Sequence, residues 1–412
     1  MALPVLFVFL IVAEVLCGRA LAATPSEPPP PYSPPYLPTD ASQVLQNGLP
    51  SKSDPEVRKM EALRVKHDAH PDDLKTALAL SQIYVTYGRG IGDAHYAGYA
   101  EVAIAPWLRQ TPPLPDVLIM HATILQYLHK FSAAQVELEK ALARDPGNAN
   151  GWLTRAFTAM VQGQFDVANQ SCVHLTQSGG PFLGLVCTAT LRSFTGHAEQ
   201  AYAILKMDQG GGPKVPASIK SWIQSLLAES AERLGESAQA EQHFKQALAF
   251  QPGDNFLLVN YADFLLDQGR PQDVIKLLGN YAQSDTAFLR IALAKQALHS
   301  PDLARYTWIM AARFAALQMR GDTIYGREHS RFVLHMEHDP EGALKLAERN
   351  WTVQRAPWDA RVYLEAALAA GKPEAAQPVL DFLDQTKLQD PIIDKLAQRA
   401  RTELQKKKVA QR

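Results

Sequence analysis

Three side chains near residue 335 are the best candidates for chemistry in this sequence. His335 and His338 are spaced i, i+3 and are followed by Asp339, so on a helix the two imidazoles could share one face and bind a metal ion. His329 is the one further histidine nearby, and cysteines are lacking there. Because a metal site needs about four ligands, we expect surface histidines and no bound metal.

Enzyme signatures are also lacking elsewhere. The sequence contains no GxxxxGK[ST], HExxH or GxSxG motif. The glycine-rich stretch 88–92 follows an apparent helix instead of a strand, which favours a turn between helices over a phosphate-binding loop. We therefore expect no catalytic residue and no cofactor. An enzyme that uses His335, His338 and Asp339 remains an alternative hypothesis, and stoichiometric metal in the purified protein would support it.

Composition limits the class of protein. Of 412 residues, 47% are hydrophobic, which is typical of a folded chain and not of a disordered one. The 41 Lys and Arg are balanced by 42 Asp and Glu. A dedicated nucleic-acid binder would carry a basic surplus, so we expect no nucleic-acid partner.

Residues 1–22 have the features of an export signal. The apolar run at 3–13 is shorter than the roughly 20 residues that span a bilayer, and Ala-Leu-Ala at 20–22 matches a small-x-small cleavage site. A lipid anchor on Cys17 is disfavoured, because Leu16 replaces the small residue expected before it. No later segment is long and apolar enough to span a membrane. We expect an exported protein, periplasmic or secreted.

Residues 23–54 form a predicted linker. Eight of the 28 prolines lie in PSEPPPPYSPPYLP at 25–38. Proline fixes φ and lacks a donor, so this stretch is predicted to be extended, in a polyproline II conformation. A stiff spacer is favoured, and docking of its PxxP spacings in an aromatic groove is the alternative.

A 34-residue period runs through the rest of the chain. Ala122 and Ala156 are one period apart, as are Gly235 and Gly269. Within each period, two apolar runs of helical periodicity meet at a turn. One such hairpin cannot bury its own apolar face, so neighbouring hairpins must stack.

This pattern resembles the tetratricopeptide repeat. The residues that carry the resemblance are Trp152, Ala156, Gly163, Phe165 and Ala168 in one unit and Ala240, Phe244, Ala247 and Pro252 in another. The resemblance implies an all-α fold, a right-handed superhelical solenoid of helix-turn-helix units. We expect about nine units over 55–389, clearest at 115–284, then a C-terminal capping helix and basic tail at 390–412. In this family, nine units would approach one superhelical turn.

The resemblance also implies where a partner would bind, along the first helix of each unit. By register, the groove positions are Thr123, Tyr127, Phe157, Met160, Glu229, Glu232, Arg233, Asp263 and Asp267. The middle is apolar and aromatic, and the later units carry carboxylates, a surface that suits an extended peptide or an amphipathic helix. The family's chaperone-tail clamps need Lys and Asn where Ile119 and Thr123 stand, so that activity is not implied.

Two functions follow from these observations. The first is an exported scaffold that binds proteins or peptides, in an envelope complex. The second is a component of polysaccharide-export or secretion machinery, which a neighbouring synthase or outer-membrane channel gene would favour.

Cys172 and Cys187 would lie on adjacent helices of neighbouring units. In an oxidising compartment they could form a disulfide, worth about 3 kcal/mol for a 15-residue loop. Free cysteine in the core is the alternative, because both positions are apolar ones in the repeat.

Overall fold

The computed structural model describes residues 54–207, 215–319, 321 and 324–410. The predicted export signal and all of the linker except Asp54 lie outside this range. Within it, the chain forms helices joined by turns, with no strand. The predicted all-α fold is confirmed.

The helices pair as hairpins, from α2/α3 to α18/α19, with α1 before them and α20 after them. Their bounds are α1 Pro55–Ala69, α2 Leu74–Ile91, α3 His95–Leu108, α4 Pro115–Tyr127, α5 Phe131–Arg144, α6 Ala149–Val161, α7 Phe165–Gly179, α8 Pro181–Phe194, α9 Ala198–Met207, α10 Ala217–Arg233, α11 Ser237–Phe250, α12 Asn255–Asp267, α13 Pro271–Leu278, α14 Asp285–Ala297, α15 Leu303–Met319, α16 Gly326–His335, α17 Pro340–Trp351, α18 Pro357–Ala369, the 3-10 helix η3 Pro373–Ala376, α19 Gln377–Thr386 and α20 Pro391–Ala410. None of the described helices is long and apolar enough to cross a bilayer.

The repeated small and bulky positions build the core between these helices. Ala122, Ala156 and Ala240 are fully buried where the helices approach most closely, and Leu138 and Phe244 fill the space beside them. The spacing of these residue types therefore places each helix against its neighbours.

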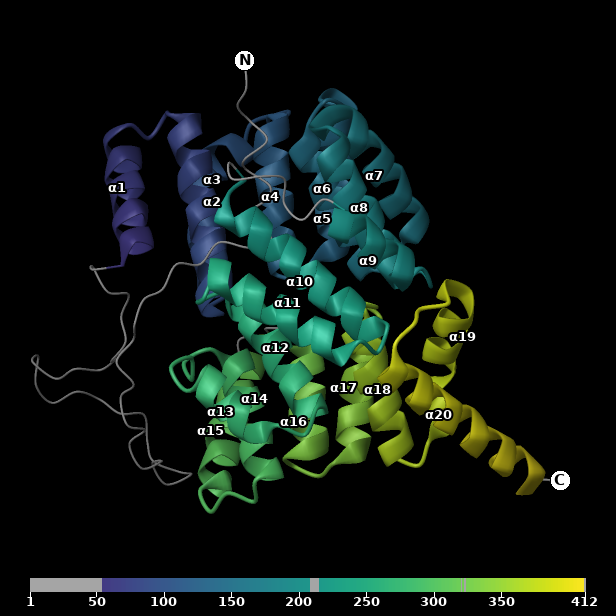
Figure 1. The fold of residues 1–412 in the computed structure, drawn as a ribbon. Helices are drawn as coiled ribbons and strands as arrows, with labels where there is room; N and C mark the ends of the chain where they lie inside the picture. Colours follow the sequence, from purple (N-terminus) through teal and green to yellow (C-terminus); the bar gives the residue numbers. More distant parts are fainter. Residues whose placement is uncertain (1–53, 208–214, 320, 322–323, 411–412) are drawn as a thin grey trace, which may run out of the picture.

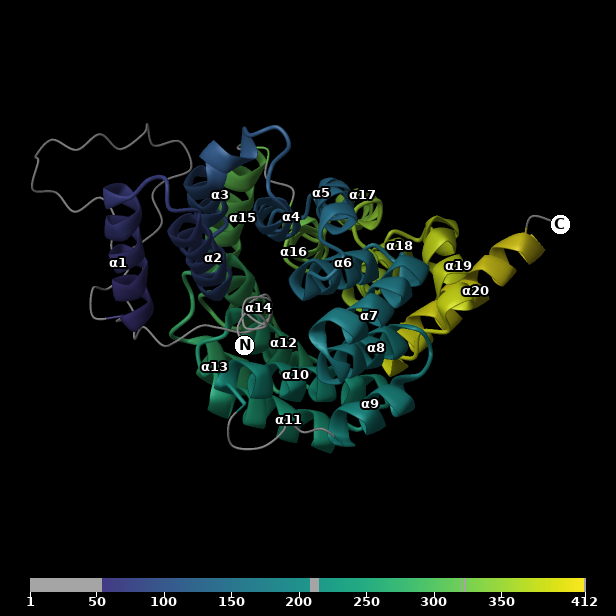
Figure 2. The same cartoon turned by 90° about the horizontal axis from the view of Figure 1, so that it is seen from above.

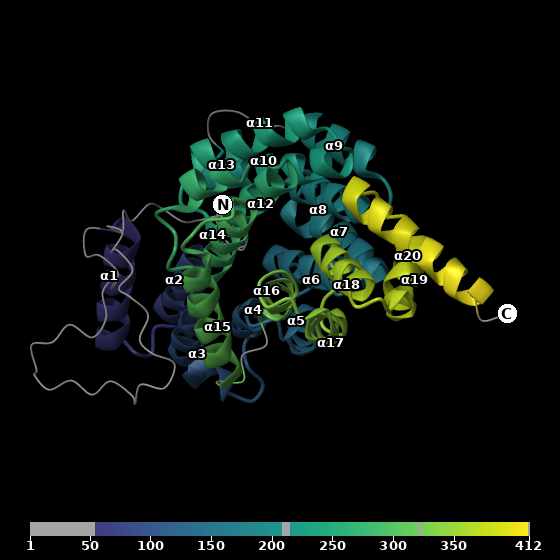
Figure 3. The ribbon, with the colours of Figure 1, turned by 90° about the horizontal axis from the view of Figure 1, so that it is seen from below.

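The hairpins wind into a right-handed superhelix. Seen from above, the chain turns clockwise as it descends from α2 to α18 (Figure 2). The helices α8, α10 and α12 lie on the inner side and α9, α11 and α13 on the outer side, which the view from below also shows (Figure 3). The first helices of these units thus line the inside of the superhelix, as the repeat register predicts.

The superhelix makes more than one turn. The helices α12–α20 lie below α2–α9, and α10 and α11 connect the two layers (Figure 1). The two layers touch: the Ala198 N–H donates to Gln389 Oε1 (3.1 Å), 191 residues along the chain, and the Arg355 N–H donates to the Val161 carbonyl (2.7 Å). The expectation that nine units only approach one turn is wrong, because one turn takes between five and six 34-residue periods. Within the second layer, Arg361 of α18 also reaches Asp267 of α12, 94 residues earlier.

The glycine-rich stretch is part of a helix. The helix α2 continues through Gly88 and Gly90 to Ile91, and only Gly92 leaves it, in the left-handed conformation. The predicted long turn at 88–92 is therefore wrong. Its glycines sit inside a helix whose Gly88 faces the start of α3, where a Cβ atom would lie 2.6 Å from that of Tyr96.

Candidate functional site

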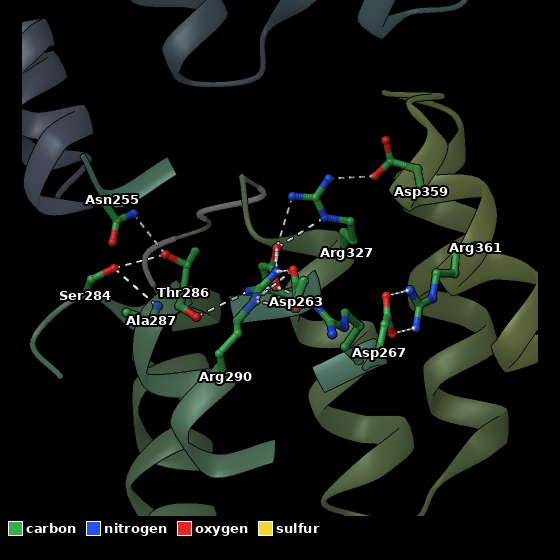
Figure 4. A network of polar contacts seen from close by, with 12 residues as sticks. Asn255, Asp263, Asp267, Ser284, Thr286, Ala287, Arg290, Arg327, Asp359 and Arg361 are labelled. Atoms are coloured by element: carbon green, nitrogen blue, oxygen red, sulfur yellow. Dashed lines mark hydrogen bonds and ion pairs between the residues drawn. The ribbon is translucent and has the colours of Figure 1, made fainter. Parts of the chain in front are cut away.

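The inner face of the second turn carries a network of charged side chains. They come from the first helices of four successive units, α12, α14, α16 and α18 (Figure 4). Capping groups set the start of two of these helices. Asp254 Oδ1 accepts the Leu257 N–H at α12 (2.9 Å), and Ser284 Oγ accepts the Ala287 N–H at α14 (3.4 Å). Asn255 Nδ2 donates to Thr286 Oγ1 (3.1 Å), which ties the two helix starts together.

Arg290 is the centre of the network and is fully buried. Its guanidinium donates to both oxygens of Asp263, at 2.6 Å from Nη2 to Oδ2, and to both oxygens of Glu328. Arg331 is the second cation on this carboxylate, with Nη1 donating to Asp263 Oδ1 (3.0 Å). Arginine suits this role, because its planar fork binds two carboxylates at once and stays charged when buried.

The electrostatics keep these buried carboxylates ionised. Burial by itself raises the pKa of Asp263, but the charges of Arg290 and Arg331 outweigh it and hold the pKa below its ordinary value. Burial likewise opposes ionisation of Glu328, while Arg290, Arg327 and Arg331 lower its pKa to about 2. The centre is thus a set of compensated charges that locks α12, α14 and α16 together.

The outer part of the network is more exposed. Arg361 donates to both oxygens of Asp267 (2.6 and 2.7 Å) and to Glu365 Oε1 (2.8 Å). The half-buried ring of Trp358 lies under two guanidinium groups, those of Arg361 at 4.3 Å and Arg331 at 4.8 Å from its centroid. This part offers an aromatic ring and partly solvated charges to a ligand.

Four of the nine predicted groove residues are buried by the chain itself. Thr123 bonds to the Ile119 carbonyl, Met160 lies in the core, Arg233 donates to Ser193 Oγ (2.7 Å), and Asp263 belongs to the arginine network. A partner has almost no access to these four side chains. They are core positions held by contacts within the chain, which for Arg233 include Ser193 of the preceding unit.

The other five predicted groove residues are half-buried on the inner side, and their contact with a partner stays a prediction. They are Tyr127, Phe157, Glu229, Glu232 and Asp267. Tyr127 donates to the Asp93 carbonyl (2.9 Å), and the ring of Phe157 lies 5.8 Å from that of Trp222.

The acidic members of this group lie close enough to act on one another. Glu229 pairs with Arg233 (3.4 Å). Burial raises the pKa of Glu232 well above its ordinary value, and the carboxylates of Glu229, Asp267 and Asp390 raise it further, while Arg233 partly offsets them. The carboxylate of Glu232 is therefore held in surroundings that disfavour its charge.

None of the four arginines of the network, Arg290, Arg327, Arg331 and Arg361, is among the predicted groove residues. Asp263 and Arg331 are 68 residues apart, two full periods, and Arg327 and Arg361 are one period apart. Extending the period beyond residue 284 would have placed these arginines on the inner face. The weak repeat signal of the later units concealed them. Arg290 is off this register, and no sequence signal identifies it.

The histidine group does not form a metal site. The helix α16 ends at His335, and His338 lies outside it with a positive φ of 56°, so the two imidazoles do not share a helix face. Asp339 instead caps α17 by accepting the Gly342 N–H (2.9 Å). In the described part of the chain, no group of three His, Cys, Asp or Glu side chains could hold a metal ion.

Cys172 and Cys187 are joined in a disulfide that links α7 to α8. Their Cα atoms are 5.5 Å apart. Both residues are buried in the core between the two helices.

No protein-family model matches this sequence, and no curated protein sequence matches it. Several solved structures are similar to it in fold. They include a tetratricopeptide repeat protein from Parabacteroides merdae (13% identity, 62% of this chain and 92% of that one, TM-score 0.38). Human IFIT1 in a dimer with m7Gppp-AAAA is another, with 11% identity, coverage of 84% of this chain and 86% of that one, and a TM-score of 0.46. Yeast Tom70 is a third, with 11% identity, coverage of 85% of this chain and 93% of that one, and a TM-score of 0.35. At these scores the tetratricopeptide-like fold rests on the 34-residue hairpins of the chain itself.

Proposed function

We propose that this solenoid of tetratricopeptide-like hairpins is an exported scaffold that binds a protein partner on its inner face. The observation that carries the proposal is the row of half-buried aromatic and charged side chains that successive first helices place on that face, from Tyr127 and Phe157 to Glu232 and Trp358. A face of this mixed character suits a peptide or a helix with both apolar and charged side chains.

The partner we infer is basic where it meets α10 and α12. Glu229, Glu232 and Asp267 bring three carboxylates together, of which Glu229 pairs with Arg233 and Asp267 pairs with Arg361. A lysine or arginine of a partner would relieve the repulsion on Glu232. Binding would then weaken with added salt, because part of the attraction is between partly solvated charges.

The test uses the full chain as bait for proteins of an envelope fraction, at low and high salt. We expect Glu232→Gln to weaken capture of a basic partner about tenfold, since removing a charge from such a contact costs about 1.4 kcal/mol or more. Glu199→Gln is the matched control, because Glu199 is exposed on α9, on the outer side. Capture that is equal for both variants would refute the acidic binding face.

Export and membership of an envelope complex are part of this proposal. The apolar segment at 3–13, the Ala-Leu-Ala sequence at 20–22 and the paired Cys172 and Cys187 support it. Fractionation of cells that express the tagged chain tests it, and the protein should appear with periplasmic or secreted markers. A protein found with cytoplasmic markers would contradict export.

A further inference from the structure

Four tyrosines gather on the first hairpin, at the N-terminal end of the solenoid. Tyr84 and Tyr87 come from α2, and Tyr96 and Tyr99 come from α3. The ring of Tyr84 lies 6.2 Å from that of Tyr96 and 5.6 Å from that of Tyr99, and Tyr96 lies 5.1 Å from Tyr87. We call these four residues the tyrosine cluster.

The tyrosine cluster is partly open to solvent. Tyr99 is 57% exposed, and Val102, on the same face one helical turn further along α3, is 72% exposed. Met60 and Leu63 of α1 pack against the same small core as Tyr84, formed by Leu80, Ile83 and Ala103. The helices α1 and α3 thus flank an aromatic surface whose floor is Tyr84, and α1 to α3 stand at one end of the solenoid (Figure 2).

The hydroxyl groups of the cluster are available as donors. Among the described residues, the hydroxyls of Tyr84, Tyr96 and Tyr99 make no hydrogen bond, and the three rings lie against one another. Burial raises the pKa of Tyr96 to about 12, with Asp93 and Tyr99 adding to the effect, so its hydroxyl stays protonated at neutral pH. Aromatic faces together with hydroxyl donors are what a polyproline II segment needs, because its rings stack and its backbone carbonyls only accept.

The chain itself carries a segment of this kind. Residues 28–38 read PPPPYSPPYLP. The described chain begins at Asp54, just before α1, and the carboxylate of Asp54 is close enough to raise the pKa of Tyr87. The 15 residues between Pro38 and Asp54 can span up to about 50 Å, so they reach the cluster with ease.

We propose that residues 28–38 of the same chain dock on the tyrosine cluster between α1 and α3. The short connection favours docking within one chain, because it raises the effective concentration of the segment to roughly the millimolar range. The prolines would stack on Tyr84, Tyr96 and Tyr99, and the tyrosine hydroxyls would donate to the carbonyls of the segment. Docking would cover Tyr99 and Val102, which the described residues leave exposed.

Cross-linking of introduced cysteines tests the docking. The full chain carries Cys17→Ser, and Cys172 and Cys187 are bridged, so that Ser33→Cys and Val102→Cys supply the free thiols. A short bis-maleimide should join them within one chain about tenfold faster than it joins Ser33→Cys to Val136→Cys. Val136 is the matched control, because it is a valine on α5, away from the cluster, and is 49% exposed.

Two further variants complete the test. Adding Tyr99→Ser should reduce the Val102 rate to that of the Val136 control, and a circular dichroism melt shows whether this exposed substitution leaves the fold intact. Hydrogen exchange of α3 in the chain without introduced cysteines should rise when Pro29, Pro31 and Pro35 become Ser. Equal rates at Val102 and Val136, or products that link two chains and depend on concentration, would overturn docking within the chain.

Discussion

Arg290 is the residue on which most of the inner charge network depends. It is 2% exposed and contacts two carboxylates that are also buried. A buried ion pair gains little over an apolar replacement of the whole group, but removing one member leaves uncompensated charge in the core. The stability of the fold therefore depends on a cation at residue 290 that compensates the two carboxylates.

We predict that Arg290→Met destabilises the second turn by about 3–5 kcal/mol, because Asp263 and Glu328 lose the cation between them. The measurement is urea unfolding at neutral pH. Lys276→Met on α13 is the control, since its pair with Asp273 is exposed and worth less than about 1 kcal/mol. Equal effects of the two substitutions would show that the network does not hold the helices together.

Asp254, the capping residue of α12, makes stability depend on pH. Burial raises its pKa from 3.8 to about 6, and its hydrogen bonds to Leu257 and Phe256 only partly offset this. Because the folded pKa is the higher one, the carboxyl contributes its full stability below pH 3.8 and loses it as the pH rises through about 6.

We predict that Asp254→Asn, which keeps an N-cap acceptor without the charge, is more stable than the parent at pH 7 by about 2 kcal/mol. At pH 4 the gain should shrink to a small fraction of that value. Urea midpoints at the two pH values measure it. A gain of the same size at both would show that Asp254 does not titrate as its burial requires.

Among the elements, the loop between α8 and α9 contacts the second layer of the superhelix. Gly196, between α8 and α9, has a φ of +75°, and a Cβ atom there would lie 2.6 Å from the Lys387 carbonyl oxygen. Gly269, between α12 and α13, has a φ of +67° and has open space around the same position. The two glycines share a left-handed backbone and differ mainly in whether another atom occupies the space that a Cβ atom would need.

We predict that Gly196→Ala and Gly269→Ala both lose about 1 kcal/mol for the left-handed backbone, and that Gly196→Ala loses roughly 1–3 kcal/mol more from the clash. Hydrogen exchange around Lys387 should rise only in Gly196→Ala. Identical unfolding curves for the two variants would mean that the two layers do not press on each other at this turn.

The disulfide joins α7 to α8, in adjacent units. If the chain is exported, we predict that denatured protein from the envelope contains no free thiol at Cys172 and Cys187. Thiol counting with and without a reductant checks this. Two free thiols per mature chain would contradict the bridge, and Cys172→Ala with Cys187→Ala serves as the zero reference.

At the scale of the whole molecule, α20 closes the array. Ile393, Ala397 and Ala400 are buried, and α20 packs against α18 and η3. Its first residue, Pro391, lies 3.5 Å from the position of a Cβ atom at Gly235, in the turn between α10 and α11. The helix thus covers the last hairpin and touches a distant unit.

We predict that deleting residues 390–412 lowers solubility and makes α18 and α19 melt several degrees before the rest. In a solenoid each unit is held mainly by its neighbours, so loss of the cap exposes the last one. Differential scanning calorimetry with hydrogen exchange measures this. The shorter deletion of residues 411–412 is the control, and an unchanged single transition in the longer one would contradict the role of α20.

The local sequence pattern is enough to specify the helical hairpins and their order. Small residues recur at a 34-residue spacing, as from Ala122 to Ala156 and from Gly235 to Gly269. Each helix packs chiefly on its sequence neighbours, so a local pattern is enough to specify it. The same reasoning placed Cys172 and Cys187 on adjacent helices and put Asp263 and Asp267 on the inner side.

The tightness of the superhelix and the contacts of the inner residues, in contrast, depend on how all units stack. Small rotations between units add up along the array, and no single repeat encodes their sum. Asp263 therefore meets Arg290 and Arg331 of later units, and Tyr325 donates to the Gly92 carbonyl from 233 residues away. Contacts over such distances depend on the whole curve of the chain, so the register of one unit does not specify them.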